Sequence, residues 1–578
     1  MNAETNTKQK WSLLVPLVLA VSIGLRLIGL GASSLTMNEA ENALSALGLF
    51  EAGSVSTQLL YTLPTALLFR MFGDSNFTAR LFPALMGIVL SIIPIILRSK
   101  IGERKAVLLA FLMAVDPVVL FWSKRADALI PAMALFAISA AFLLNGKKTA
   151  AMFCFLTALC GGERSIPILA AASAARIPGL LMSGSGLRNF LPVQLNKRDL
   201  CAGAGFLILL VTLFGIFPGG LGSFCSGIAA GFLRSASWTH PGAAAVAVAL
   251  AVYGGIPLLL FIWSCIMDRQ PVKLFAAAAF IVLFLLWQGI TAFPWISVFL
   301  WIGSADLILQ HVDKGRSGSR FLFCVAAGAV IGGYSFFYFR LVEVFNQSNG
   351  NEAVQISWNG MLQTLPITRV GAASLLTLMA VLILALIVKI LLGFSDSDSI
   401  RRGLLCGAVV IAGWGLITNI WNTGGFDRIG DHPADTHLKN SLLLLNGNYT
   451  SFTDSPLPEI LEETIHKHGD APNTDYGLNL IADDPLLTWM LRSCRGIHTS
   501  ANLQTDLSGI DLILDKSGTS FAEKGYVGTL FPYRSTMHWE RLKLMDWGKW
   551  LLFGDGPELT EIPLTFWTRG NFIFSNEE

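Results

Sequence analysis

Long runs of apolar residues, separated by short polar connections, fill the first three quarters of this chain. A helix crosses the hydrocarbon core of a bilayer in about 20 residues, so runs of this order predict transmembrane helices. The pattern predicts about thirteen spans, at 11–31, 80–97, 106–121, 127–145, 149–161, 165–182, 201–217, 241–266, 274–291, 293–310, 321–341, 370–393 and 403–421. We therefore expect an all-α polytopic membrane domain over residues 1–422.

The pattern changes beyond residue 422, where charged and turn residues become frequent and apolar runs shorten to strand length. The segments DYGLNLIADDP and GIDLILDKSG each place a short apolar strand before a turn. The segment SPLPEILEETIHKHG ahead of them is typical of an amphipathic helix. This arrangement predicts a soluble α/β domain over residues 423–578.

Composition supports a bilayer environment. Hydrophobic residues make up 53% of the 578 residues and charged residues only 14%, against about 25% charged residues in a typical soluble domain. The formal net charge of +2 gives no indication of a nucleic-acid partner. We find no glycine fingerprint, phosphate loop or nucleophile elbow in the tail, which argues against nucleotide chemistry there.

The basic residues indicate an orientation, because Lys and Arg in short loops remain on the cytoplasmic side. They gather in alternate connections, at 8–10, 98–105, 147–148, 188–198, 269–273, 314–320 and 401–402. Within the spanning part, the Lys124-Arg125 pair is the exception to this pattern. The N-terminus is then expected in the cytoplasm of a multi-pass cell-membrane protein. An odd number of spans places the tail on the extracytoplasmic face, together with the loops 32–79, 122–126, 162–164, 218–240 and 342–369.

Three of these outer loops carry candidate chemistry. The first has Asn38, Glu39 and Glu41 on a stretch from 38 to 50 whose apolar stripe predicts a helix lying along the membrane interface. Carboxylates close to a membrane are costly unless they are used or solvated. The plainer interpretation of these carboxylates is that they are solvated charges on an interfacial helix.

The second outer loop places Asp116, Lys124, Arg125 and Asp127 in one short hairpin. Further candidates on the same side are Arg80, Glu163 and Arg164. An Arg fork binds phosphate oxygens with two hydrogen bonds, so this mixture of charges suits an anionic lipid headgroup. The alternative is a hairpin whose ion pairs only hold two helices together.

An ordered series of motifs over residues 20–180 resembles the GT-C membrane glycosyltransferases that use polyprenyl-phosphate-linked sugars. These include relatives of protein O-mannosyltransferases and lipid A aminoarabinose transferases. The motifs are Arg26 in the first span, the Asn38-Glu39 pair, Arg80-Leu81 and Arg125-Ala126-Asp127. The family usually has aspartate where this chain has Asn38. The tail segments DPLLTWMLRSCRGI and YVGTLFPYRSTMHWERLKLMDWGKWLLFGDGP resemble the extracytoplasmic domain of some prokaryotic members.

The resemblance implies transfer of a sugar from a polyprenyl-phosphate donor to a lipid, glycan or protein acceptor, with inversion at the anomeric carbon. Glu39 is the first choice for the base and Asp127 the second. The expected substrate-binding residues are Asn38, Glu41, Arg80, Lys124, Arg125, Glu163 and Arg164. A divalent metal ion would suit this chemistry, although no ligand spacing requires one.

Two other interpretations stay open. A polytopic transporter or lipid flippase would also be helical, although transporters usually show repeated halves and ionisable residues near the middle of the membrane. A catalytically inactive relative that acts as a lipid-binding scaffold is the other, and Asn38 is the residue that favours it.

Overall fold

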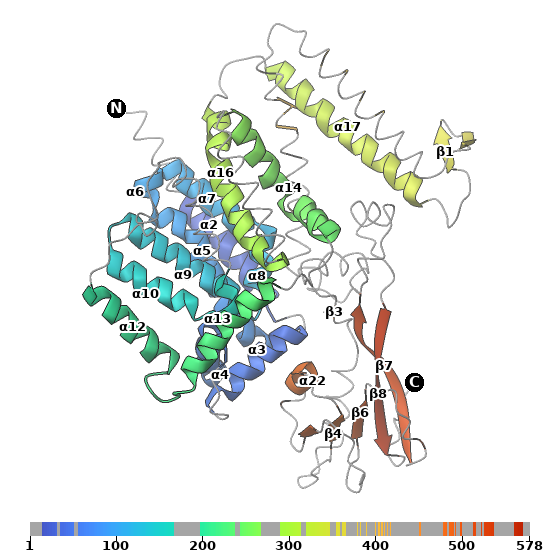
Figure 1. Ribbon diagram of the computed structural model, residues 1–578. Helices are drawn as coiled ribbons and strands as arrows, with labels where there is room; N and C mark the ends of the chain where they lie inside the picture. The colour runs from blue at the N-terminus through green and yellow to red at the C-terminus, as the bar shows by residue number, and fades with distance from the viewer. Residues whose placement is uncertain are drawn as a thin grey trace.

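Figure 1 shows the computed structural model of the chain, a helical bundle with a sheet beside one of its ends. The described residues are 14–31, 35–50, 56–166, 197–236, 243–267, 289–313, 320–346, parts of 354–417 and, in the tail, six strands, a short helix and a few neighbouring positions. Four of the expected spans lie for the greater part outside these described residues, namely those at 165–182, 274–291, 370–393 and 403–421. The expected amphipathic helix at 455–469 lies outside it as well.

Helix α5 (Asn76–Ile96) lies at the centre of the N-terminal half of the bundle. It packs against α2 (Leu14–Leu27), α4 (Leu59–Phe72), α7 (Glu103–Val115) and α9 (Leu129–Leu144). The other described helices of the bundle are α6 (Arg98–Ile101), α8 (Pro117–Ser123), α10 (Lys148–Leu159), α12 (Lys197–Val211), α13 (Gly220–Ala236), α14 (Ala243–Met267) and α16 (Phe293–Asp313). Helix α17 (Arg320–Asn346) follows them in the chain.

One helix among the described residues, Asn76–Ile96, is both long and apolar enough to cross a bilayer. Helices α7 and α8 would form a second span together, although they are bent by 61° at Asp116. The described apolar stretches of the other helices are 10–17 residues long. Large apolar side chains such as Leu67, Leu209 and Leu259 are at least half exposed on the outer surface of these helices, which is the arrangement expected where lipid replaces water.

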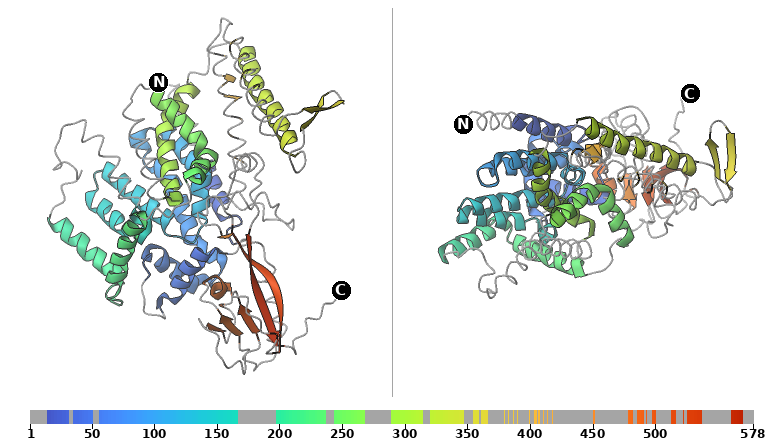
Figure 2. Two further views of the ribbon diagram at one scale, coloured as in Figure 1. Left: turned by 45° about the vertical axis from the view of Figure 1, so that its right-hand side comes forward. Right: turned by 90° about the horizontal axis from the view of Figure 1, so that it is seen from above.

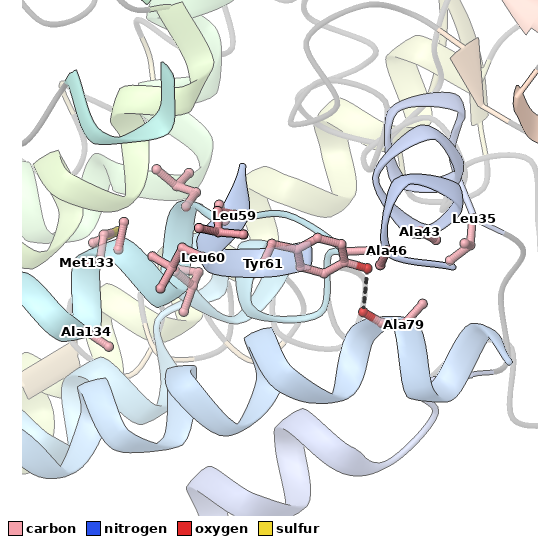
Figure 3. Packing of buried hydrophobic residues seen from close by; sticks show 14 of the residues in the cluster. Leu35, Ala43, Ala46, Leu59, Leu60, Tyr61, Ala79, Met133 and Ala134 are labelled. Atoms are coloured by element: carbon pink, nitrogen blue, oxygen red, sulfur yellow. Dashed lines mark hydrogen bonds between the residues drawn. The ribbon is translucent and has the colours of Figure 1, made fainter. Parts of the chain in front are cut away.

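The first expected outer loop, 32–79, contains two helices. The expected helix at 38–50 is present as α3 (Met37–Leu47) followed by a 3₁₀ turn at Gly48–Phe50. The apolar helix α4 was not expected within this loop. Its Tyr61 is fully buried between α3 and α5 and donates a hydrogen bond of 2.9 Å to the carbonyl of Ala79 (Figure 3).

Two other expected loops also contain regular structure. Helix α13 fills most of 218–240, and the hairpin of β1 (Val354–Trp358) and β2 (Met361–Leu365) lies within 342–369. Both views in Figure 2 show α17 running away from the bundle, with this hairpin beyond its end. The pattern alone did not predict these elements because each is short or only moderately apolar.

The tail forms a six-stranded mixed sheet in the order β3-β7-β8-β6-β4-β5. Its strands are β3 (Thr450–Ser451), β4 (Leu478–Ile481), β5 (Ile497–Thr499), β6 (Leu512–Asp515), β7 (Tyr526–Thr536) and β8 (Thr560–Arg569). Both strands expected from the sequence are present, as β4 and β6, and they pair in parallel. Helix α22 (Pro485–Met490) follows β4. A helix between parallel strands is the α/β pattern that the sequence predicts for this region.

The tail contacts the bundle through α22, which packs on α3. In Figure 1, α3, α4 and α22 gather at one end of the bundle, whereas α6, which carries Arg98 and Lys100, lies at the other. The sheet and the first outer loop therefore share one end of the molecule.

Candidate functional site

The Glu39 carboxylate is the centre of a buried network. Glu39 lies in the first turn of α3 and is 3% exposed. Its two oxygens accept six hydrogen bonds of 2.9–3.0 Å, from the backbone and hydroxyl of Thr36, two nitrogens of Arg80, one of Arg125 and the amide of Ala126. This is more than the roughly four lone-pair positions of a carboxylate, so some of these bonds share a position.

The donors reach Glu39 from three segments of the chain. Thr36 is the N-cap of α3, and its backbone N–H is satisfied by the side chain three residues on, as in a capping box. Arg80 lies one turn into α5, where Ser75 caps the helix by accepting from the amide of Thr78. Arg125 comes from the loop between α8 and α9, and its guanidinium lies 4.5 Å from the ring of Phe121. Glu39 therefore joins three helix ends.

The same loop continues the network to the next turn. Asp127 is 5% exposed, and its Oδ1 accepts a hydrogen bond of 2.8 Å from the amide of Leu129 at the start of α9. Its Oδ2 lies 2.9 Å from Nη2 of Arg164 in the 3₁₀ turn Gly162–Ser165. Glu163 of this turn is half-buried, with Oε1 3.8 Å from Nε of Arg164. The turn itself is seated on α13, where Gly231 leaves no room for a side chain against Glu163.

The charges explain which groups stay ionised. Burial alone would raise the pKa of Glu39, but the cationic Arg80 and Arg125 and the hydrogen bonds lower it well below its usual value. Burial lowers the pKa of Arg164, and the charges of Asp127 and Glu163 outweigh this and raise it. Both groups therefore remain charged across the physiological pH range.

Lys124 is a buried cation of the same loop. Its Nζ donates a hydrogen bond of 2.7 Å to the carbonyl of Ile28, and the residue is 9% exposed. Burial, and then the positive charges of Arg80 and Arg26, lower its pKa to about 7. A nearby anion would reverse this effect, because an opposite charge favours the protonated amine.

The structure places the expected site residues in three groups. Glu39, Arg80 and Arg125 are in direct contact, Asp127, Glu163 and Arg164 form the adjoining ion-paired group, and Lys124 lies in the loop that joins them. Asn38 and Glu41 are exposed on α3 beside Glu39. With Glu41, the expected charged residues comprise four cations and four carboxylates, so groups that can bind an anion lie near groups that can accept a proton.

Asp116 does not belong to this group, although the sequence places it in the same hairpin. It lies at the bend between α7 and α8, where its Oδ1 caps α8 by accepting from the amide of Val119 at 2.7 Å. Its Oδ2 accepts from the hydroxyl of Ser297 and from the indole of Trp301, both on α16. The helix α8 separates it from Lys124 because Pro117 starts a new helix immediately after the bend.

Arg26, the family-like arginine of the first span, also serves this bend. Its guanidinium donates hydrogen bonds of 3.2 Å to the carbonyls of Met113 and Ala114 at the end of α7. The Met113 carbonyl would bond to the residue four positions on, but Pro117 has no N–H. Arg26 replaces this missing donor.

Sequence reasoning missed several contributors to the site. Thr36 had a readable signal, since the spacing from Thr36 to Glu39 is that of a capping box. Asn42, whose amide donates to the carbonyl of Ala126 at 2.9 Å, had none. Among the described residues, no three His, Cys, Asp or Glu side chains are grouped as ligands for a metal ion.

Comparison of the chain with models of known protein families finds no match, and neither does comparison with curated proteins. The solved structures that are similar to it include two of ArnT from Cupriavidus metallidurans. The apo structure is 16% identical with a TM-score of 0.45, and the alignment covers 87% of each chain. The structure bound to undecaprenyl phosphate is 14% identical with a TM-score of 0.48, covering 85% of this chain and 86% of that one.

Both structures are less than 25% identical to this chain, and at TM-scores below 0.5 they give no correspondence between individual residues.

Proposed function

We propose that this chain is an inverting membrane glycosyltransferase that moves a sugar from a polyprenyl-phosphate-linked donor to an acceptor on the extracytoplasmic face. The acceptor is a lipid, a glycan or a protein. The observation that carries the proposal is the convergence of Arg80, Arg125 and Arg164 on two buried carboxylates, Glu39 and Asp127, at the end of the bundle where the tail docks.

This convergence suits a lipid phosphate for a physical reason. A phosphate that leaves the anomeric carbon carries negative charge, and cations already fixed in place stabilise that charge without reorganising. Glu39 holds Arg80 and Arg125 in fixed orientations, and Lys124 gains its proton most easily when an anion is near. Apolar side chains on the outer surface of the helices suit the polyprenyl tail.

We assign the base to Asp127 ahead of Glu39, which reverses the order expected from the sequence. The six hydrogen bonds on Glu39 and its lowered pKa make it a weak proton acceptor. Asp127 accepts one bond on each oxygen, so each oxygen keeps a lone-pair position for an acceptor hydroxyl.

The step is an in-line displacement. Asp127 removes the proton from the acceptor hydroxyl, whose oxygen attacks the anomeric carbon. The bond between that carbon and the phosphate oxygen breaks, and the polyprenyl phosphate leaves with the electron pair. The positive charges of Arg80, Arg125 and Lys124 stabilise the negative charge of the leaving phosphate.

The test uses purified full-length protein in lipid with synthetic polyprenyl-phosphate sugars, and it follows sugar transfer and donor hydrolysis. We expect Asp127→Asn to lower kcat by about 10²–10⁴, the usual contribution of a general base, with little change in donor affinity. Asp306→Asn is the matched control, because Asp306 is an exposed carboxylate that pairs with Lys105 away from the site. Turnover of Asp127→Asn at the level of this control would refute the assignment. Donor binding by the wild type without turnover would favour the inactive scaffold.

A further inference from the structure

Helix α22 of the tail packs against the end of the bundle that holds the candidate site. Its Leu486 and Leu487 are 3% and 0% exposed, and they belong to the same apolar core as Ala40 and Ala43 of α3. The core continues into the tail sheet through Leu514. The tail and the bundle therefore share one core at this point.

Trp489 fixes the position of α22. It is 1% exposed, and its ring centroid lies 5.7 Å from that of Phe69 on α4. Its Nε1 donates a hydrogen bond of 2.9 Å to Oδ1 of Asn76, the first residue of α5. A buried indole N–H requires a partner, so this bond specifies the docked position as well as stabilising it.

Arg492 is bonded to the turn that precedes α5. Its Nε lies 2.7 Å from Oδ2 of Asp74, and its Nη2 donates to the backbone carbonyl of the same residue at 2.7 Å. The guanidinium also lies 4.0 Å from the ring of Trp489. Within this turn Gly73 has a φ of +82°, which glycine adopts without strain. Two residues later Ser75 caps α5.

We propose that Trp489 and Arg492 are positioning residues of the transferase site, which hold the start of α5 and the helix α3 in register. Arg80 lies one turn beyond Asn76, and Glu39 lies in the first turn of α3. The two bonds of 2.9 and 3.0 Å between Arg80 and Glu39 depend on the spacing of these helix ends. Helix α22 is packed on α3 and bonded to the start of α5.

The effect on turnover rests on the proposed function, whereas the effect on helix position does not. The experiment therefore measures both on the full chain in lipid nanodiscs. Amide hydrogen exchange at residues 37–47 and 76–80 reports the position of the helices. The KM and kcat for a polyprenyl-phosphate sugar report the site.

The variants are Trp489→Phe, which keeps a ring but loses the N–H, and Arg492→Gln. Lys105→Gln is the matched control. The Lys105 and Asp306 pair has the same 2.7 Å separation as the Arg492 and Asp74 pair, and the exposures of the cations, 24% and 20%, are similar. The control pair joins α7 to α16 rather than the tail to the site.

We expect both tail variants to speed exchange in α3 and at the start of α5, while α9 exchanges as in the wild type. KM for the donor should rise about tenfold, which corresponds to about 1.4 kcal/mol, and kcat should change less. Arg492→Lys should recover part of the loss because it keeps the ion pair.

Unchanged exchange in α3 would overturn the proposal, and so would faster exchange accompanied by wild-type KM and kcat. Absence of transfer by the wild type would overturn the proposed function instead. The exchange data would still decide whether the tail positions these helices.

Discussion

Two buried polar clusters of the bundle differ in whether their charged side chains bind one another or bind neutral groups. The Glu39 cluster comprises Glu39, Arg80 and Arg125, and its carboxylate pairs with both guanidinium groups. The Asp116 cluster comprises Asp116, Ser297, Trp301 and Arg26, where each carboxylate oxygen has its donors and Arg26 binds backbone carbonyls.

The difference separates a binding arrangement from a structural one. The Asp116 cluster supplies the hydrogen bonds that a 61° bend and Pro117 remove from the helix. Its polar groups make these structural hydrogen bonds, except for Nε of Arg26, which has no hydrogen-bond partner. The Glu39 cluster instead places two arginine side chains, both held by one carboxylate, at an end of the bundle, and guanidinium groups are well suited to bind an anionic ligand.

The largest expected effect follows Glu39→Gln. A carboxamide has one oxygen, so at least two of the donors around it, one of them charged, lose their acceptor. Breaking a buried ion pair in this way costs about 3–5 kcal/mol. We expect a large loss of stability in lipid, measured by thermal unfolding, together with a loss of donor binding. Wild-type stability would show that the network is not as tightly bonded as described.

Gly87→Ala should have the next largest effect, because Gly87 lies where the two clusters approach each other. A methyl group there would lie 2.6 Å from Cβ of Ser123 on α8 and 2.8 Å from Nε of Arg26. Overpacking of this kind costs about 1–3 kcal/mol, and α8 has to move because Ser123 is short and rigid. Thermal unfolding measures this cost. Gly24→Ala is a suitable control, since its nearest contact is at 3.9 Å.

Asp116→Asn should separate the two clusters most clearly. One amide oxygen cannot serve Val119 and Trp301 from both sides, so one donor is left unpaired at a cost of about 1–3 kcal/mol. We expect lower stability but nearly normal turnover per folded molecule. Loss of turnover as complete as that of Asp127→Asn would mean that the bend takes part in catalysis.

The smallest expected effect is a change in pH dependence at Lys124. Below pH 7 its amine is protonated already, whereas above pH 7 binding of an anionic donor has to take up a proton. Affinity for a polyprenyl-phosphodiester sugar, whose own charge is constant in this range, should fall by up to about tenfold per pH unit above 7. Lys124→Arg should bind with nearly constant affinity from pH 6 to 9, because arginine stays charged. Equal slopes for the two proteins would contradict this assignment.

The sequence predicted those features that depend on local pattern. The helix expected at 38–50 and the strands expected in DYGLNLIADDP and GIDLILDKSG follow from the pattern of apolar positions, and each is present. The expected place of that helix along the membrane interface remains a prediction. The apolar helix Leu59–Phe72 was missed because its 14 residues are too few for a span. The orientation of the chain in the membrane and the domain boundary at 422 remain predictions.

The contacts of the site could be predicted only in part. The charged residues were recognisable by type and loop, but which oxygen of Glu39 meets which arginine depends on how α3, α5 and the loop before α9 pack. Asp116 was grouped with Lys124 because they are close in sequence. The helix that starts at Pro117 separates them, and no count of charges reveals this.

The bond between Arg492 and Asp74 joins residues 418 positions apart. During synthesis, the N-terminal helices emerge long before α22 exists, and contacts over such separations form late in folding. A nascent chain therefore holds its arginines and carboxylates in an incomplete arrangement until the tail has been made and has docked. By this timing, the contacts of Trp489 and Arg492 with the N-terminal helices exist only once α22 has been synthesised, and a product truncated before α22 would lack them.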